Sequence, residues 1–387
     1  MTALSLFSGC GGDTLGMTRA GFTIVAYSEF KQPAIDSHQA NFPESVLIKD
    51  SKGKFTDLTK IEDSQFIPYK GLPYKGVDLV FAGFPCQGFS KAGKKNVTDP
   101  RNQMFRHFVR VVKITQPKHF IGENVVGLTS MKSGPNETDP LMLDIIKAAF
   151  TEIGYTLSYK ILEARNFGAP QKRKRCLLVG WRSDTAFDPV AYWKAVDAFG
   201  ATKIQATPTL RSFVKITLEG AYKIPDTSIP NDFATYALPI PEDQEPTGTP
   251  HPYVILKANA KLLSCSKRIS PVHSEIIDLD APSKTIICTY DHQPRLLVGY
   301  RKPSGACYAR VLLPDELKQI QGFPEDYKVL GSQKDQVVQI GNAVPPQIIE
   351  AIATVLSRTM PTAMPTAMPA PTVVKVKRVI KVKKTST

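Results

Sequence analysis

The segment from Asp78 to Ser90 constrains the fold of this chain more than any other. Its sequence, DLVFAGFPCQGFS, begins with the apolar run Leu79–Ala82, which predicts a buried strand. The strand leads into the pair Pro85 and Cys86, in a turn flanked by glycines that leave room for another molecule. Ligands of open α/β sheets bind beyond the carboxyl ends of the strands. The pattern therefore favours Cys86 as a nucleophile that faces a bound ligand. An isolated cysteine is more often an inert, buried small residue.

Short apolar runs alternate with helical patterns through the first part of the chain. Strands are expected at Ala3–Phe7, Thr23–Ser28, Val46–Ile48, Leu79–Ala82 and His119–Gly122. Helices are expected between them, at Thr14–Ala20, Gln32–Asn41, Met104–Ile114 and Leu141–Ile153. This order is typical of an α/β fold, a parallel sheet with helices on both faces. Two further strands, at Tyr155–Leu162 and Arg175–Trp181, predict a hairpin that closes the sheet.

The composition changes after Trp181. Residues from about 184 to 300 are rich in proline, threonine and lysine, which indicates a second, smaller and loop-rich domain. Helical patterns return at Leu312–Gln321 and Pro346–Ser357. We therefore expect a large domain at 1–183, completed by 335–358, and a small domain at 184–334. The Pro/Ala-rich and then Lys-rich tail at 359–387 is expected to be disordered.

The charge balance indicates a polyanionic partner. The formal net charge is +14, and the six basic residues beyond Thr372 leave +8 when they are removed. A nucleic acid is the simplest partner of such a chain, although a solvated basic surface would give the same balance. No apolar run approaches the roughly 20 residues that cross a bilayer, so we expect a soluble, intracellular protein without a membrane partner. The six cysteines contain no Cys-x-x-Cys pair, so neither a zinc site nor a disulfide framework is indicated.

Four further segments carry candidate chemistry, each with a plainer alternative. Leu4–Gly16 predicts a strand, a glycine-rich turn and a helix start, which suits a bound ligand or a generic turn. Glu29, at the end of the second strand, can hold ribose hydroxyls. Glu123 ends the fifth strand beside the predicted cysteine turn, as a catalytic acid or a helix-terminal charge. Gln171–Arg175, QKRKR, is an anion clamp or a solvated hairpin tip, and Gly341–Pro346 is a cofactor contact or a helix cap.

The order and spacing of these segments resemble the cytosine carbon-5 DNA methyltransferases across nearly all of residues 1–358. The matching motifs are Phe7–Gly12, Glu29–Phe30, Gly83–Ser90, Asp99–Arg101 with Met104, Glu123–Val125, Phe167–Arg175, Pro282–Ile286, Arg310–Pro324 and Gly341–Val344. The resemblance implies a methyltransferase sheet of Rossmann-like type with a smaller target-recognition domain. It also implies S-adenosylmethionine as cofactor and double-stranded DNA as partner, in a monomer of the restriction-modification type.

The resemblance also implies the site residues. Catalytic roles fall on Cys86, Glu123, Arg173 and Arg175: the Cys86 thiolate attacks carbon-6 of a flipped-out cytosine, Glu123 faces ring nitrogen 3, and the two arginines hold the base. Cofactor contacts fall on Phe7, Ser8, Gly9, Gly11, Gly12, Glu29, Phe30, Asp50, Pro85, Met104, Asn342, Ala343 and Val344. Substrate contacts fall on Ser90, Gln171 and Thr285.

Three questions stay open at this stage. Asp57 competes with Asp50 for the contact to adenine, because an extra basic stretch lies between them. A transfer-RNA methyltransferase of the same fold is an alternative, against which stands the sequence Cys288-Thr289-Tyr290 where that group carries Cys-Phe-Thr. A catalytically dead DNA-binding protein is the other alternative, against which stand the intact catalytic matches.

Overall fold

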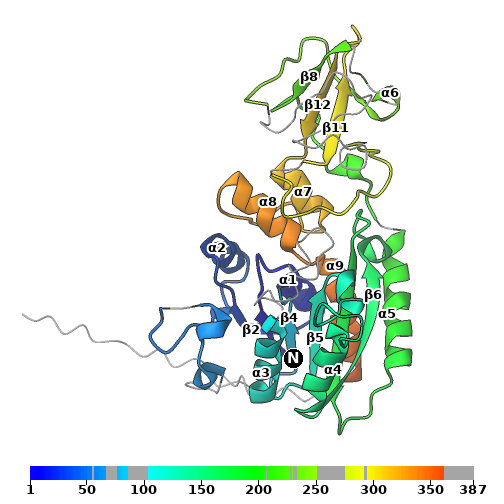
Figure 1. Cartoon of the computed structure of the whole chain (residues 1–387). Coiled ribbons are helices and arrows are strands. Elements are labelled where there is room, and N and C mark those ends of the chain that lie inside the picture. Colours follow the sequence, from blue (N-terminus) through cyan, green and yellow to red (C-terminus); the bar gives the residue numbers. More distant parts are fainter. Residues whose placement is uncertain are drawn as a thin grey trace, which may run out of the picture.

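A seven-stranded mixed sheet forms the larger of two units in the computed structural model, which describes residues 1–54, 56–66, 76–85, 103–205, 207–226, 229, 233–250, 275–291 and 294–360 (Figure 1). The strand order is β3-β2-β1-β4-β5-β7-β6. The bounds are β1 Thr2–Leu6, β2 Thr23–Ser28, β3 Val46–Leu47, β4 Leu79–Ala82, β5 His119–Asn124, β6 Tyr155–Glu163 and β7 Lys174–Arg182. β1 to β5 are parallel, and β6 and β7 add an antiparallel hairpin. The expected α/β fold class and the closing hairpin are confirmed.

Helices cover both faces of this sheet. On one face lie α3 (Met104–Thr115) and α4 (Met142–Thr151), with the 3-10 helices η1 (Leu58–Lys60) and η2 (Asp63–Phe66). The buried residues of α3 recur at helical spacing, Phe105, Phe108, Val111, Val112 and Thr115, which turns one apolar stripe onto the sheet.

The opposite face is covered by the first helix and the last. α1 (Gly12–Arg19) and α9 (Pro346–Thr359) pack on it side by side. A Cβ atom added at Gly16 would lie 2.5 Å from the carbonyl oxygen of Pro346, so the two helices approach as closely as glycine allows. α2 (Gln32–Asn41) lies beside β2, where His38 stacks on Tyr27.

Helix α5 (Pro189–Ile204) also belongs to the larger unit, although it follows the expected boundary at 183/184 and no helix was expected there. It begins at Asp188, whose side chain accepts hydrogen bonds from the amides of Val190 and Ala191. Its Tyr192 hydroxyl donates to Ile352 O of α9 (3.0 Å). The helix escaped sequence analysis because its apolar residues do not gather on one side.

The smaller unit contains a five-stranded sheet in the order β10-β11-β12-β8, with β9 paired to β11. The bounds are β8 Tyr222–Ile224, β9 Leu238–Pro239, β10 Glu275–Ile276, β11 Leu296–Arg301 and β12 Cys307–Val311, with the one-turn helix α6 at Phe233–Tyr236. Helices α7 (Pro314–Ile320) and α8 (Gln333–Asn342) lie between the two sheets (Figure 1).

Both connecting helices contribute to the core of the smaller unit, through Leu317, Ile320, Val337 and Ile340. Arg310 of β12 and Glu316 of α7 form a fully buried ion pair (2.7 Å). The Glu316 carboxylate also accepts from the amides of Lys215 and Leu313, so it fixes α7 to the small sheet. α8 therefore packs with the smaller unit, although residues from 335 onward were expected to complete the larger one.

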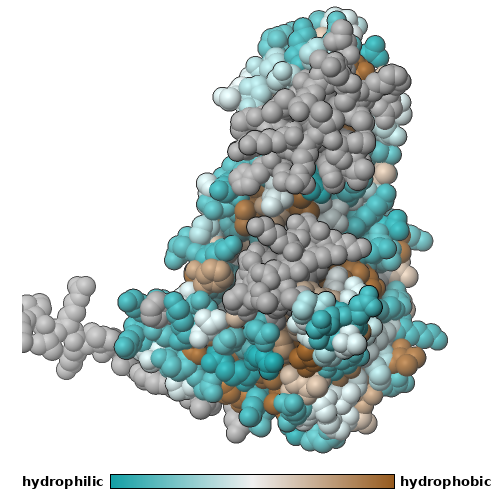
Figure 2. All heavy atoms as spheres, in the orientation of Figure 1, coloured by the Kyte–Doolittle hydropathy of each residue, from teal (hydrophilic) through white to brown (hydrophobic). Residues whose placement is uncertain are grey.

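Hydrophilic side chains cover most of the described surface on the face shown in Figure 2, and the hydrophobic patches between them are small. None of the helices in the described ranges is long and apolar enough to cross a membrane.

Candidate active site

The carboxyl ends of β2, β1, β4 and β5 lie side by side, because these four strands are parallel neighbours. Glu29, Phe7–Gly12 and Gly83–Pro85 follow β2, β1 and β4, and Glu123 is the second-last residue of β5. Several of the predicted cofactor and catalytic residues lie in these four places. They converge at the edge of the sheet where α/β proteins bind ligands.

The glycine-rich turn after β1 has an unusual backbone. Phe7 has φ of 56°, in the left-handed region that residues other than glycine seldom adopt, and Gly9 has φ of 55°. The turn is tied to β2, because Ser8 N donates to Ser28 O (3.0 Å) and Gly9 N donates to Glu29 Oε2 (3.0 Å). A left-handed non-glycine residue held by such bonds, and followed by a glycine-rich turn at the strand end, favours a functional role for this turn.

Glu29 is fixed from two directions. Its Oε2 accepts from Gly9, and its Oε1 accepts from the amides of Phe30 (2.8 Å) and Lys31 (2.9 Å). The Phe30 side chain beside it is 59% exposed, which is unusual for a large aromatic residue. An oriented carboxylate next to an exposed aromatic ring suits the ribose and the base of a nucleoside.

The turn fits an adenosyl cofactor in two further respects. Among the described residues, the buried Ser8 hydroxyl has no hydrogen-bond partner, so it is available to a ligand. A Cβ atom added at Gly9 would meet no atom of the described ranges within 4 Å, so they leave this side of the turn open.

Gly11 and Gly12, which were expected to contact the cofactor, are packed against protein. A Cβ atom at Gly11 would lie 2.8 Å from both the Phe42 ring and the Tyr327 hydroxyl. At Gly12 it would lie 2.5 Å from the carbonyl oxygen of Val344. Because these positions are glycines, the segment between α7 and α8 and the loop before α9 can pack on the turn. Asn342, at the end of α8, is exposed, and in the loop that follows Ala343 is half-buried and Val344 is buried. The terminal motif therefore lies against the first one.

Asp50 and Asp57 have different surroundings. Asp50 is 6% exposed just beyond β3, and its Oδ1 accepts from Lys54 N (2.5 Å). Asp57 caps η1, because its Oδ1 accepts from both the amide and the hydroxyl of Thr59 (2.9 Å each). Both carboxylates therefore accept hydrogen bonds from the protein, Asp50 as a buried side chain and Asp57 as a helix cap. Met104, another expected cofactor contact, is half-buried at the start of α3.

A buried polar cluster lies behind the turn. The Ser5 hydroxyl of β1 donates to Asp13 Oδ2 (2.5 Å), and Thr14 Oγ1 lies 3.1 Å from Nε2 of His38. Burial raises the pKa of Asp13 to about 7 and lowers the pKa of His38 to about 3. The motif matches of the sequence did not include this cluster, since none of its members lies in them.

Glu123 and Arg175 meet at the centre of the candidate site. Arg175 Nε lies 2.7 Å from Glu123 Oε1, and both side chains are 13% exposed. A Cβ atom at Gly83 would lie 3.8 Å from Glu123 Oε2, so the carboxyl group borders the turn after β4. Asn124 Nδ2 donates to Phe84 O (3.3 Å) and holds this turn against β5. Asn124 belongs to one of the matching motifs, but nothing in the sequence pattern predicts this contact.

The turn beside Glu123 leads to the expected nucleophile. Pro85 is half-buried and is the last described residue before Gln103. Cys86 and Ser90 lie outside the described residues, so their roles stay predictions. The described cysteines, Cys10, Cys176, Cys288 and Cys307, are free, and no group of metal-binding side chains occurs in the described part of the chain.

Arg173 was expected to hold the target base together with Arg175, but it is 1% exposed. It donates to the carbonyl oxygens of Ile286 (2.8 Å), Gly341 (2.9 Å) and Ala343 (3.0 Å). Gln171 is fully buried in the same region. Thr285 is half-buried, and its hydroxyl donates to Lys172 O (3.3 Å). The structure therefore separates the two arginines, one at Glu123 and one inside the protein.

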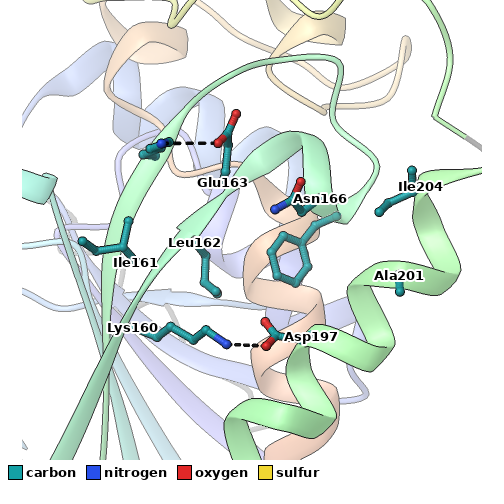
Figure 3. Close-up of a pocket in the computed structure, with 10 residues that line it drawn as sticks. Lys160, Ile161, Leu162, Glu163, Asn166, Asp197, Ala201 and Ile204 are labelled. Carbon is teal, nitrogen blue, oxygen red and sulfur yellow. Dashed lines mark hydrogen bonds and ion pairs between the residues drawn. The ribbon is translucent and has the colours of Figure 1, made fainter.

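A surface cavity of about 570 Å³ lies away from these groups, between β6 and α5 (Figure 3). Its charged side chains are paired with one another, Lys160 with Asp197 and Glu163 with Lys174. None of the expected catalytic or cofactor residues lines it.

The sheet, the glycine-rich turn and the paired acid at the end of β5 define an α/β enzyme with a nucleoside-binding edge. A family model described as C-5 cytosine-specific DNA methylase matches residues 1–358, and the chain belongs to this family. It is a DNA methyltransferase that acts on carbon-5 of cytosine, as the resemblance implied.

The most similar curated relatives include type II methyltransferases. M1.HphI of Haemophilus parahaemolyticus is 31% identical over 371 residues, which cover 91% of this chain and 86% of that protein. M.NgoPII of Neisseria gonorrhoeae is 27% identical over 93% of this chain and 96% of that protein. Among solved structures, the S. pombe Dnmt2 methyltransferase has a TM-score of 0.63 at 18% identity, over 93% of this chain and 99% of that one. This last likeness shows the fold.

Proposed function

We propose that the enzyme transfers a methyl group from S-adenosylmethionine to carbon-5 of a cytosine that has flipped out of duplex DNA, through a transient bond to Cys86. The contact between Glu123 and Arg175, beside the turn that leads to Cys86, carries this proposal. It puts a carboxyl group and a guanidinium next to the position where the sequence presents a nucleophile. A cytosine must leave the base stack to reach such a site.

The turn after β1 and the end of β2 would hold the cofactor. Glu29 would bind ribose hydroxyls, the exposed ring of Phe30 would stack on adenine, and Asp50 would accept from the adenine amino group. The buried hydroxyl of Ser8 would bond to the polar end of the ligand. The bound cofactor supplies a methyl group on a positively charged sulfur, which a weak carbon nucleophile can accept.

The side chains of the enzyme make carbon-5 nucleophilic. When the Cys86 thiolate bonds to carbon-6, the electrons of the ring double bond move toward nitrogen 3, and Glu123 donates a proton there. Arg175, fixed on Glu123, would bind the base carbonyl and stabilise the charge. After methylation, loss of the carbon-5 proton to a base re-forms the double bond and expels Cys86.

The smaller unit would select the sequence. Base contacts specify a DNA site while phosphate contacts position the protein, and a separate unit beside the catalytic edge can supply the former. We propose double-stranded DNA as the substrate, read by a monomer inside the cell. The type II names of the relatives support a modification enzyme of restriction-modification type.

Trapping with 5-fluorocytosine tests the proposal, because fluorine on carbon-5 cannot leave as a proton and the adduct persists. The substrate is duplex DNA with a sequence that the enzyme methylates and with 5-fluorocytosine at the target position. With this DNA, cofactor and wild-type enzyme, we expect a denaturant-resistant complex linked through Cys86. Cys86→Ser should form none, whereas Cys288→Ser, at a half-buried free thiol, should still form it. Transfer RNA with the same base is the comparison substrate. A complex on RNA alone, or one that survives Cys86→Ser, would reject the proposal.

A further inference from the structure

Three buried polar side chains, Gln171, Arg173 and Gln321, close a hydrogen-bonded ring where the two units meet. Each is at most 1% exposed. Gln171 accepts from Ile286 N (3.2 Å) and donates to Gln321 Oε1 (2.8 Å). Gln321 donates to Ala343 O (2.5 Å). Arg173 completes the circuit by donating to both Ala343 O (3.0 Å) and Ile286 O (2.8 Å).

The ring joins two segments that serve different ligands under the proposed function. One is 283–286, which runs beside 170–173 through hydrogen bonds between Ser283 and both Pro170 and Lys172. It carries Thr285, an expected substrate contact. The other is 341–344, the end of α8 and the residues after it, which packs on Gly12 of the cofactor turn through Ala343 and Val344. Arg173 reaches this segment twice, at Ala343 and at Gly341.

The chemistry of the ring suits a guanidinium and no other cation. The planar guanidinium of arginine places several N–H donors at fixed angles, so it can bind carbonyl groups of separate segments at the same time. A lysine ammonium is a single point and cannot span them. Burial of a charged side chain is costly, and its retention here points to a need for these fixed positions. With 1% exposure, the side chain has no surface left for a base.

We propose that Arg173 is a positioning residue, which holds 283–286 and 341–344 together, while the base contact stays with Arg175 as in the proposed function. This inference rests on the proposed function for the identity of the two ligands. A residue that touched only the base would leave cofactor binding unchanged in the absence of DNA. A residue that holds both segments should weaken the binding of both ligands.

The experiment compares Arg173→Lys with Arg175→Lys and with a matched control, Arg165→Lys. Arg165 lies in the 3-10 helix η5 (Ala164–Phe167), 48% exposed, paired with Glu163 at the surface. Calorimetry without DNA measures S-adenosylmethionine affinity, steady-state kinetics give KM and kcat, and 5-fluorocytosine trapping reports the covalent step. For Arg173→Lys we expect about tenfold weaker cofactor binding and an equal rise in KM for DNA, with kcat within about threefold and the adduct still formed at saturation. Arg175→Lys should keep cofactor affinity and lose kcat and the adduct.

The inference is overturned if Arg173→Lys binds cofactor like Arg165→Lys while kcat falls, because that is the behaviour of a catalytic group. If Arg173→Lys does not fold, Gln321→Glu removes one donor of the ring and keeps the acceptor, and should raise both binding constants in parallel. An effect of Gln321→Glu on one ligand alone would equally contradict the ring. If wild type binds cofactor but methylates no DNA, the proposed function fails, and the calorimetric comparison still tests the ring.

Discussion

Glu123 Oε1 lies 2.7 Å from Arg175 Nε, and both side chains are largely buried. Under the proposed function, the Glu123 carboxyl group donates a proton toward ring nitrogen 3 as charge develops there. Glu123→Gln keeps the shape and a donor but cannot transfer a proton. We expect kcat to fall about a hundredfold or more, with cofactor affinity nearly unchanged. Methyl incorporation and calorimetry measure the two quantities, and a loss of cofactor binding at preserved kcat would move Glu123 to the cofactor site.

Asp13 gives the enzyme a pH-dependent stability. Burial raises its pKa to about 7 in the folded state, far above the usual value near 4. Between these values the unfolded chain releases the proton and the folded protein keeps it, so stability falls as pH rises, by at most about 1.4 kcal/mol per unit. Asp13→Asn removes this term. We expect the variant to gain stability relative to wild type on going from pH 5 to pH 8.

Urea unfolding gives the free energy of unfolding of both proteins at the two pH values. The difference between variant and wild type at each pH removes the contribution of the other titrating groups. An equal difference at pH 5 and pH 8 would show that Asp13 does not titrate with folding.

The sequence predicts which strand ends lie close together better than it predicts the surroundings of individual side chains. Glu29 and Glu123 could be placed because each ends a strand that an apolar run makes visible, and parallel neighbours bring strand ends together. Arg173 and Arg175 could not be told apart, since both belong to one polar run between strands. What separates them is burial by 286 and 341–343, segments more than a hundred residues away.

At the scale of elements, the close contact between α5 and η5 is the informative one. A Cβ atom at Gly200 would lie 2.7 Å from the carbonyl oxygen of Asn166 and from the Phe167 ring. Helix propensity alone predicts that Gly200→Ala stabilises α5 by about 1 kcal/mol. The packing predicts the reverse, a loss of about 1–3 kcal/mol.

Ala198→Gly, at an exposed position of the same helix, is the matched variant, and it should lose about 1 kcal/mol through propensity. Denaturant midpoints of the two variants decide between the effects. A Gly200→Ala protein more stable than wild type would mean that α5 does not pack on η5 as described.

Most elements of the larger unit were predictable, and α5 and α8 show why others were not. β2, β4 and α2 begin and end at the expected residues, because apolar runs or turn residues mark both ends. α8 is short, and its buried residues face a sheet that the sequence could not position. The three-residue strand β8 and the two-residue strand β9 are visible only through their partners in β11 and β12.

At the scale of the whole molecule, charge sets how the enzyme approaches DNA. The tail beyond Thr372 adds six cations and no acid to a chain of net charge +14. The tail lies outside the described residues, and the buried Met360 marks a sensible end for a truncation. We expect deletion of 361–387 to weaken DNA binding mostly at low salt and to reduce the slope of log affinity against log salt by up to about 5.

Binding isotherms of full-length and truncated protein over a salt series measure that slope, with methylated-site mapping as the control for sequence choice. Equal slopes would show that the tail does not contact DNA. A changed target sequence would show that it does more than attract phosphate.

The packing of α1 on α9 has a consequence for the order of events during synthesis. The turn after β1 leaves the ribosome more than 300 residues before the loop and helix that support it through Gly12 and Gly16. A nascent chain that already carries Glu29 and Glu123 therefore cannot complete its cofactor site until translation has passed residue 359. Premature termination anywhere before that point should yield an inert product, not an enzyme that methylates with relaxed specificity.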